Sequence, residues 1–194
     1  MKTLALFDFD GTLYKKDSLI EFTRFVKSNR IFYSGMLWLL PSLIGLKLRL
    51  IHNEKVKVKF LTYFFKDMEL EEFIAAANEF ALQKIAPDLN QKIFTSFLGH
   101  LKAGHTVYIV SASLPEWIAP WSAQHGVEVI GTKMELKENR LTGKLASVNC
   151  YGPEKTNRIK KILDLEQFDV IKVYGSGKGD VEMQQLARTK IPQQ

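Results

Sequence analysis

The feature that most constrains this chain is the short apolar run Thr3–Phe7 together with the five residues after it, Asp8-Phe9-Asp10-Gly11-Thr12. An apolar run of this length, bounded by a turn that contains glycine, is typical of a buried β-strand. Two carboxylates therefore follow a strand directly, where open α/β sheets form their ligand crevices. Two acids in a loop are ordinarily just solvated, but this position favours a site that holds a hard cation or divides nucleophile and acid–base roles.

The second half of the chain alternates between strand and helix patterns. Units of strand, loop and helix predict a parallel sheet with crossover helices, so we expect an α/β fold with a Rossmann-like core. The predicted helices are 87–104, Leu114–His125, Pro153–Leu165 and Asp180–Arg188, and the predicted strands are Thr106–Val110, Val127–Gly131, a hairpin over Met134–Leu145, and Val170–Tyr174. After Asp180 the sequence leaves little room for another strand.

The stretch between the first strand and residue 85 is helical in pattern. Asp17 and Ser18 are candidate N-caps, and apolar residues recur at helical spacing through Glu54–Phe65 and Glu69–Lys84. We therefore expect residues 1–16 and 86–194 to form the α/β core. Residues 17–85 would be an inserted helical cap over the carboxyl end of the first strand.

Composition limits the class of partner. The 194 residues carry a net charge of +6, which favours phosphorylated metabolites, anionic lipid or nucleic acid as partners. We do not expect nucleic acid, because no stripe of Arg and Lys interleaved with stacking aromatics is present. The single cysteine, Cys150, indicates a reducing compartment and is predicted to be a small buried hydrophobe. Met1-Lys2-Thr3 leads directly into the strand, so the predicted location is the cytoplasm.

Three further polar loops follow strand patterns or open helix patterns. They are Ser111–Ser113, Gly152–Lys155 and Gly175–Asp180. In a parallel sheet these loops converge on the edge that carries Asp8, where helix N-termini offer backbone amides and positive dipole ends. Carboxylates, a hydroxyl, a lysine and exposed amides together predict a phosphate site.

Each of these polar residues also has a purely structural interpretation. Ser111 or Ser113 can cap the helix that follows them, and for Ser113 this is the favoured role. Lys155 can be a solvated lysine on a helix face, and Asp180 can cap the final helix. The alternatives stay open for the single residues, while the order of the loops favours a common site.

At this point the chain resembles the haloacid dehalogenase superfamily, and within it the phosphoserine-phosphatase-like group with a helical cap between the first and second motifs. Asp8-Phe9-Asp10-Gly11-Thr12 matches the first motif, Ser111 the second and Lys155 the third, and Gly175–Asp180 lies where the fourth belongs. The matches span residues 8 to 180, nearly the whole chain.

The resemblance implies hydrolysis of a phosphate monoester in two covalent steps. Asp8 would attack phosphorus and form an aspartyl phosphate. Asp10 would protonate the leaving oxygen and later deprotonate the attacking water. Lys155 would neutralise charge on the nucleophile and the phosphoryl group, and Ser111 would donate a hydrogen bond to a phosphoryl oxygen. Transfer to an acceptor other than water would use the same intermediate.

The resemblance also implies the remaining ligands. Backbone groups at Gly11 and Ala112 would help to hold the phosphate. Magnesium would bind to Asp8, to the backbone carbonyl of Asp10 and to an acid of the fourth motif, for which Asp180 is the candidate. The implied activity is therefore that of a magnesium-dependent phosphatase.

The fourth motif departs from the family pattern. An aspartate is expected where this chain has Ser176, and a neutral hydroxyl is a poor ligand for a hard divalent ion. Ser176 would act weakly or through water, and the nearby Lys178 would either replace part of the cation's charge or obstruct the site. The alternative function is therefore a weak or inactive relative that binds a phosphorylated ligand.

The uncharged run Ile31–Leu46 is interrupted by Gly35, Pro41 and Gly45 and flanked by lysines and arginines through residue 59. We expect a buried helical hairpin of the cap, with peripheral contact between residues 31–59 and an anionic membrane as the alternative. Sixteen residues fall short of the roughly twenty that a spanning helix needs. The substrate is left open between a small phosphometabolite, such as a phosphoserine-like compound, and a lipid phosphate, and the oligomeric state is unknown.

Overall fold

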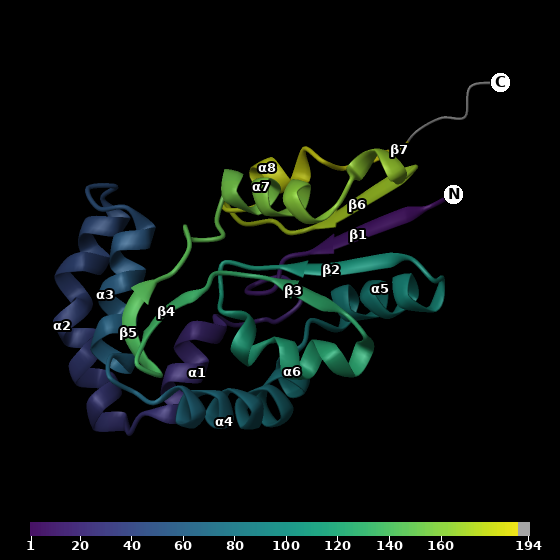
Figure 1. Ribbon diagram of the computed structural model, residues 1–194. Helices are drawn as coiled ribbons and strands as arrows, with labels where there is room; N and C mark the ends of the chain where they lie inside the picture. The colour runs from purple at the N-terminus through teal and green to yellow at the C-terminus, as the bar shows by residue number, and fades with distance from the viewer. Residues whose placement is uncertain (190–194) are drawn as a thin grey trace.

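A five-stranded sheet lies at the centre of the computed structural model, which describes residues 1–189 (Figure 1). The strand order is β3-β2-β1-β6-β7, with β1 in the middle and parallel to both neighbours. Leu4 of β1 pairs with Thr106 of β2 and with Ile171 of β6. The strands are β1 (Thr3–Phe7), β2 (Thr106–Val110), β3 (Glu128–Ile130), β6 (Val170–Tyr174) and the antiparallel β7 (Arg188–Thr189).

Helices cover both faces of the sheet, which is why β1 is apolar at the four consecutive positions Leu4 to Phe7 and not only at alternate ones. Leu4 and Leu6 pack in the same cluster as residues of α7 (Pro153–Ile162) and α8 (Val181–Gln184). Ala5 and Phe7 point to the other face, toward α5 (Gln91–Lys102) and α6 (Ala119–Ser122). All four side chains are fully buried. The predicted α/β class with a Rossmann-like parallel core is confirmed.

Four α-helices follow β1 in the chain before α5 and β2, and α2 and α3 form the outermost end of the molecule (Figure 1). The side chain of Asp17 accepts a hydrogen bond from Ile20 N at 3.1 Å, which confirms the predicted N-cap of the first helix. The helices are α1 (Ser18–Val26), α2 (Asn29–Lys47), α3 (Asn53–Phe65) and α4 (Leu70–Phe80), followed by a π-helical turn (Ala81–Ile85) and a 3-10 turn (Ala86–Asp88).

The hairpin of β4 (Met134–Lys137) and β5 (Arg140–Leu145) packs against α3, although the sequence places it in the core segment. Thr62 Oγ1 donates a hydrogen bond to Gly143 O at 3.3 Å. Gly143 has a φ of 78°, and a Cβ there would meet the backbone of Thr62, so only glycine allows this approach. The boundaries of core and cap at residues 16 and 86 stay a prediction, to which the structure adds this contact.

Two predicted helices are wrong in extent. Leu114–His125 is divided into a 3-10 turn (Pro115–Trp117), α6 and a second 3-10 turn (Ala123–His125), since Pro115 and Pro120 lack the amide that a continuous helix uses. The final helix ends at Gln184, and the two-residue strand β7 then pairs with β6, which fits the expectation of little room for another strand. The segment 190–194 lies outside the described residues.

Candidate active site

The loop after β1 turns its two aspartates away from the core. Asp8 N donates a hydrogen bond to Tyr174 O at 2.7 Å, which extends the pairing of β1 with β6. Phe9 is fully buried and stacks on Tyr14 with ring centroids 5.4 Å apart. Because alternate side chains of an extended segment point to opposite sides, Asp8 and Asp10 share the side away from Phe9. Both line a cavity of about 340 Å³ between the sheet and the cap.

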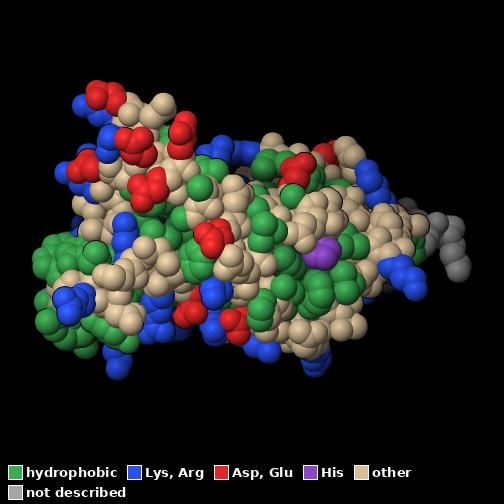
Figure 2. All heavy atoms as spheres, turned by 90° about the horizontal axis from the view of Figure 1, so that it is seen from below, with side chains coloured by type: hydrophobic (Ala, Val, Ile, Leu, Met, Phe, Trp, Pro, Cys, Tyr) green, Lys and Arg blue, Asp and Glu red, His purple; other side chains and the backbone are tan. Residues whose placement is uncertain are grey.

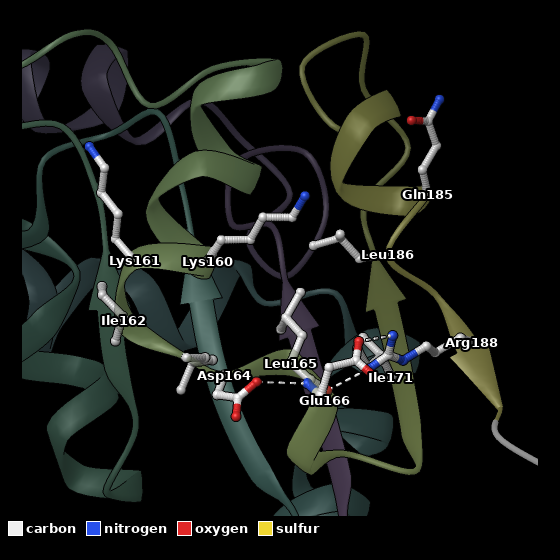
Figure 3. Close-up of a pocket in the computed structure, with 11 residues that line it drawn as sticks. Lys160, Lys161, Ile162, Asp164, Leu165, Glu166, Ile171, Gln185, Leu186 and Arg188 are labelled. Carbon is white, nitrogen blue, oxygen red and sulfur yellow. Dashed lines mark hydrogen bonds and ion pairs between the residues drawn. The ribbon is translucent and has the colours of Figure 1, made fainter.

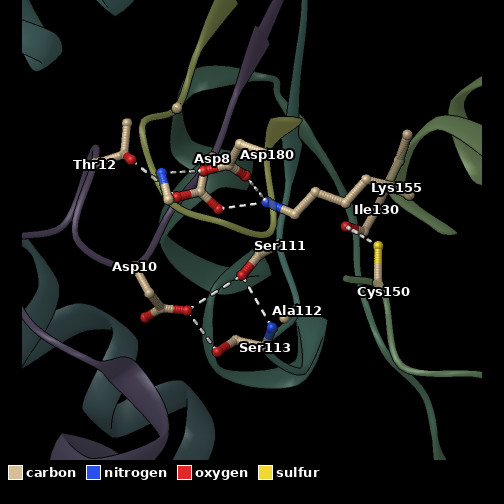
Figure 4. Close-up of polar contacts among 12 residues, drawn as sticks. Asp8, Asp10, Thr12, Ser111, Ala112, Ser113, Ile130, Cys150, Lys155 and Asp180 are labelled. Carbon is tan, nitrogen blue, oxygen red and sulfur yellow. Dashed lines mark hydrogen bonds and ion pairs between the residues drawn. The ribbon is translucent and has the colours of Figure 1, made fainter. Parts of the chain in front are cut away.

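Lys155, near the start of α7, lies between two carboxylates (Figure 4). Its Nζ is 2.6 Å from Asp8 Oδ1 and 2.6 Å from Asp180 Oδ1. The Lys155 side chain is 2% exposed, and those of Asp8 and Asp180 are 10% and 3% exposed. Burial of one ammonium with two carboxylates is costly unless each charge is paired, as it is here. The structure thus joins three of the predicted site residues in one ion network.

The pKa values of this network reflect competition between burial and pairing. Burial raises the pKa of Asp8 to about 6, although the neighbouring Lys155 acts to lower it. Burial by itself would lower the pKa of Lys155, but the carboxylates of Asp8 and Asp180 raise it above its ordinary value. Lys155 is therefore the group that favours the ionised form of Asp8, which a nucleophilic carboxylate needs.

Asp180 uses both of its carboxylate oxygens inside the protein. Oδ1 accepts from Lys155, and Oδ2 accepts from Gly177 N at 2.9 Å. A Cβ at Gly175 would lie 2.8 Å from Asp180 Cγ and 3.1 Å from Asp8 Cβ, so a glycine is needed where the two carboxylates pack over the loop. These contacts suit Asp180 as the partner that positions Lys155, and its role as a metal ligand stays a prediction.

Asp10 is held by hydroxyl and amide donors. Oδ1 accepts from Ser18 N at 2.6 Å, at the N-terminus of α1. Oδ2 accepts from Ser113 Oγ at 2.6 Å and from Ser111 Oγ at 3.2 Å (Figure 4). Asp10 therefore connects the loop after β1, the first cap helix and the loop after β2, and its orientation is fixed from three elements.

Ser113 is a residue that the sequence interpretation assigned wrongly. It does not cap the following turn, whose N-cap is Leu114 without a side-chain hydrogen bond. Its Oγ donates to Asp10 and accepts from Ser18 Oγ at 3.1 Å, and Trp117 Nε1 donates to the same Ser18 Oγ at 3.0 Å. In the sequence, Ser113 stands two residues after Ser111, and this spacing was the one sign that both hydroxyls could belong to the site.

The sequence interpretation missed Lys57 of α3 altogether. Its Nζ donates to Ala112 O and, at 3.0 Å, to Asn149 Oδ1. Burial lowers the pKa of Lys57 to about 8, while Asp10 and Asp17 act to raise it. Lys57 stands three and four residues before the buried Phe60 and Leu61, on the same face of the helix. A lysine on an apolar helix face was the sign in the sequence that this side chain is buried and has a specific partner.

The backbone positions that were expected to hold phosphate have different surroundings. Ala112 lines the cavity, and its carbonyl accepts from Lys57 and from Thr132 Oγ1, the latter at 2.6 Å. Gly11 is exposed with a φ of 74°, which makes the turn, and its amide donates to Lys16 O at 3.3 Å. Gly11 thus shapes the loop, and its predicted contact with phosphate stays untested.

The residue that departs from the family pattern, Ser176, is exposed. The neighbouring Gly177, Lys178 and Gly179 line the cavity, but Ser176 is not among its described lining residues. Cys150 is a free, buried cysteine, and its Sγ lies 3.9 Å from Ile130 O, which confirms the prediction of a small buried hydrophobe.

A larger hollow of about 630 Å³ lies at the opposite edge of the sheet, beside the turn that precedes β6 (Figure 3). Its polar groups serve the local structure. Arg188 bonds to Glu166 at 2.8 Å, and Asp164 caps the turn Leu165–Gln167 by accepting from Glu166 N. Because these groups pair with one another and do not converge on the hollow, the smaller cavity at Asp8 is the candidate active site.

Comparisons with known proteins show the family of the chain. A family model described as haloacid dehalogenase-like hydrolase matches residues 5–185. Protein CicA of Caulobacter vibrioides is 30% identical over 190 residues, which cover 96% of this chain and 84% of that protein.

Two solved structures show the same fold. A protein of unknown function from Bordetella pertussis Tohama I superposes with a TM-score of 0.81 at 24% identity, covering 94% of this chain and 86% of that one. A phosphoserine phosphatase solved as a phospho-aspartyl intermediate analogue has a TM-score of 0.66 at 18% identity, with coverage of 96% and 83%.

Proposed function

This chain belongs to the haloacid dehalogenase-like hydrolases, and from that premise we propose that it hydrolyses a phosphate monoester through a phosphoryl group carried on Asp8. The observation that carries the proposal is the buried network at the end of β1, in which Lys155 Nζ lies 2.6 Å from both Asp8 and Asp180. The phosphoserine phosphatase with a similar fold, solved as an analogue of its phospho-aspartyl intermediate, supports the same route.

In the first step Asp8 supplies the nucleophile. A carboxylate oxygen of Asp8 forms a bond to phosphorus as the bond from phosphorus to the alcohol oxygen breaks. Asp10 gives a proton to that leaving oxygen, so the alcohol departs neutral. Asp10 lines the same cavity and is held by Ser18 N and Ser113 Oγ, which keeps its carboxyl group in one orientation.

In the second step water takes the place of the alcohol. The carboxylate of Asp10, now deprotonated, accepts a proton from water as the water oxygen bonds to phosphorus. The bond between phosphorus and the Asp8 oxygen breaks, which frees phosphate and restores both aspartates. The same two residues thus serve both halves of the reaction.

Lys155 and Ser111 supply the fixed electrostatics of this proposal. Lys155 is held against Asp8 by Asp180, so its charge is in place before substrate binds and costs no reorganisation in the transition state. Ser111 Oγ donates to Asp10 at 3.2 Å, a long contact that it can exchange for a phosphoryl oxygen.

The cavity offers few side-chain ligands for a magnesium ion. Within residues 1–189, no three His, Cys, Asp or Glu side chains are grouped so as to hold a metal ion. Magnesium in phosphate chemistry commonly uses one or two carboxylates, waters and the substrate, and Asp8 supplies one carboxylate. We expect Asp8 and the backbone carbonyl of Asp10 to hold Mg²⁺, with Ser176 contributing through water, and the bound ion would offset repulsion between phosphate and carboxylate.

The cavity leaves the identity of the alcohol open. Lys57, Asn149 and Lys178 contribute polar groups to its lining. The cap helices also contribute apolar side chains, those of Leu19, Ile20, Leu43, Leu46, Val56 and Phe60. A small phosphometabolite and a lipid phosphate both remain candidates.

The decisive experiment measures phosphate release from an aryl phosphate, with magnesium and with a chelator, for the wild type and Asp8→Asn. We expect turnover with magnesium and a loss on the order of 10³-fold or more in Asp8→Asn, because the nucleophile is gone. Asp67→Asn is the matched control, since Asp67 is an exposed aspartate in a left-handed turn that asparagine also accepts. Equal rates for wild type and Asp8→Asn would contradict the mechanism.

A second candidate function is a binding protein for phosphorylated ligands, and the exposed Ser176 favours it. Ser176→Asp in the same assay separates the two. If wild type is inert and Ser176→Asp releases phosphate, the chain is a disabled relative of the enzymes. If wild type is active and Ser176→Asp changes the rate little, the altered motif is tolerated.

A further inference from the structure

Helix α2 is apolar on two opposite faces. The inner face packs on α3, and its residues Phe32, Gly35, Leu39, Ser42 and Gly45 are buried. A Cβ at Gly35 would meet the rings of Tyr63 and Phe64, and one at Gly45 would meet Ile51, so the two helices approach closely. The expected helical hairpin over Ile31–Leu46 is wrong, because the run lies within the single helix α2, which continues through Pro41. Its expected burial is correct for this face and wrong for the other.

The outer face of α2 is a stripe of apolar side chains at helical spacing, Tyr33, Leu37, Leu40, Ile44 and Leu48, with exposed fractions of 62%, 71%, 48%, 51% and 62%. Figure 2 shows hydrophobic side chains gathered at the end of the molecule that α2 forms, with Lys and Arg side chains beside them. Single exposed apolar residues are ordinary, whereas a contiguous exposed stripe marks a contact surface. We therefore treat this stripe as a contact surface for a partner.

The charge around this stripe has one sign. Residues 27–66 contain eight Lys or Arg and a single acidic residue, Glu54, which is a net charge of +7 against +6 for the whole chain. Glu54 accepts a hydrogen bond from Asn149 N at 3.1 Å. Exposed cations stand at both ends of α2, with Arg30 in its first turn, Lys47 at its last position and Arg49 just after it.

From this arrangement we propose that the outer face of α2 docks on an anionic lipid bilayer, with the helix lying in the plane of the interface. An apolar stripe flanked by cations is the pattern of interfacial helices, whose lysines and arginines reach the headgroups. The nineteen residues of α2 span roughly 28 Å at the rise of an α-helix, and cations at both ends favour the flat orientation. Within residues 1–189, no helix has the length and apolar character needed to cross a membrane.

Charge also decides between a bilayer and a second copy of the chain. A symmetric dimer through this face would bring two segments of net charge +7 together, which disfavours association. An anionic bilayer offers the opposite sign over a broad surface. Docking there would also bring the candidate active site close to the bilayer, because Leu43 and Leu46 of the same helix line the Asp8 cavity.

Trp38 is a fluorescent probe beside this contact, on the flank of α2, where its ring stacks on Tyr63 of α3. Trp38 is 55% exposed, whereas Trp117 and Trp121, the other two tryptophans, are 0% and 3% exposed. We expect vesicles that contain brominated phosphatidylglycerol to quench the Trp38 fluorescence of the wild type. Trp38→Phe should lose that quenching, because its remaining tryptophans are buried.

Co-sedimentation gives the quantitative test, with vesicles of phosphatidylcholine either pure or mixed with phosphatidylglycerol. We expect the wild type to pellet with the anionic vesicles at low salt and less so as salt rises. Leu37→Glu/Leu40→Glu should weaken that binding by roughly tenfold or more, because it places two acids on the docking face. Leu82→Glu/Leu98→Glu is the matched control, with the same charge change at exposed leucines outside α2, and should bind like the wild type.

Three results would overturn the proposal. The wild type would stay in the supernatant at low salt, or both double variants would bind equally well, or light scattering would show a dimer that Leu37→Glu/Leu40→Glu dissociates. Thermal unfolding of both variants verifies that they fold. Phosphate release from a soluble aryl phosphate is measured in parallel, so a failure of the proposed catalytic function is seen separately from a failure to dock.

Discussion

β1 and α2 both contain apolar runs without charge, and the two runs end in opposite surroundings. β1 lies between two parallel strands with helices on both faces, and Leu4 to Phe7 are fully buried. α2 packs mainly against α3, and its outer face leaves Leu37 71% exposed. The comparison shows that apolar content predicts a need for a partner, while the number of neighbouring elements decides whether the chain supplies it.

The two segments also treat charge differently. The carboxyl end of β1 carries buried ionic groups that are each paired, as Asp8 is with Lys155. The ends of α2 carry exposed cations that face solvent, such as Lys47 and Arg49. Buried charges require fixed partners, whereas exposed cations are free to respond to an external anionic surface.

The largest expected effect is at the end of β1. Lys155→Met would leave Asp8 and Asp180 buried without their shared cation, and breaking such a pair costs about 3–5 kcal/mol of unfolding free energy. Urea denaturation at neutral pH measures this, with the exposed Lys160→Met on the same helix as the control. If Lys155→Met lowers the free energy of unfolding no more than Lys160→Met does, the ion network does not stabilise the fold.

Truncations in both segments test the comparison directly. Phe7→Ala removes a fully buried ring from β1 and is expected to destabilise the protein by about 3–5 kcal/mol. Leu37→Ala removes a side chain that is 71% exposed and is expected to change the stability by no more than about 0.5 kcal/mol. Chemical denaturation of the two variants in the absence of lipid checks both values. A large loss in Leu37→Ala would mean that the outer face of α2 is already covered in solution.

A smaller effect is expected on the inner face of α2. Gly35→Ala places a methyl group against Tyr63 and Phe64, and the overpacking cost of about 1–3 kcal/mol exceeds the roughly 1 kcal/mol that alanine gains in a helix. Gly99→Ala in α5 is the control, because a Cβ there meets nothing within 4 Å. We expect a lower melting temperature for Gly35→Ala and a slightly higher one for Gly99→Ala. The opposite order would contradict the close approach of α2 and α3.

Local sequence signals were sufficient for features that form within a single helix, strand or turn. The strand over residues 3–7, the hairpin over 134–145 and the N-cap at Asp17 are as predicted, because strand pattern, turn residues and capping act within a few residues. The break of the predicted helix Leu114–His125 was also readable in principle, since Pro115 and Pro120 stand inside it. Asp8, Asp10 and Lys155 could also be picked out from the sequence, because the family motifs that contain them are short local patterns.

Contacts between distant segments could not be read in this way. Lys57 meets Ala112 and Asn149 across 55 and 92 residues, and Ser113 bonds to Asp10 across 103 residues, so neither contact leaves a local trace. The sequence by itself determined the α/β class, the family and the residues of the phosphate-site motifs. Tertiary structure decided that Lys155 joins Asp8 to Asp180, and that one face of α2 stays exposed. The reason is physical: capping and periodicity act along a few residues, whereas pairing of buried charges and burial of an apolar face depend on which elements the fold brings together.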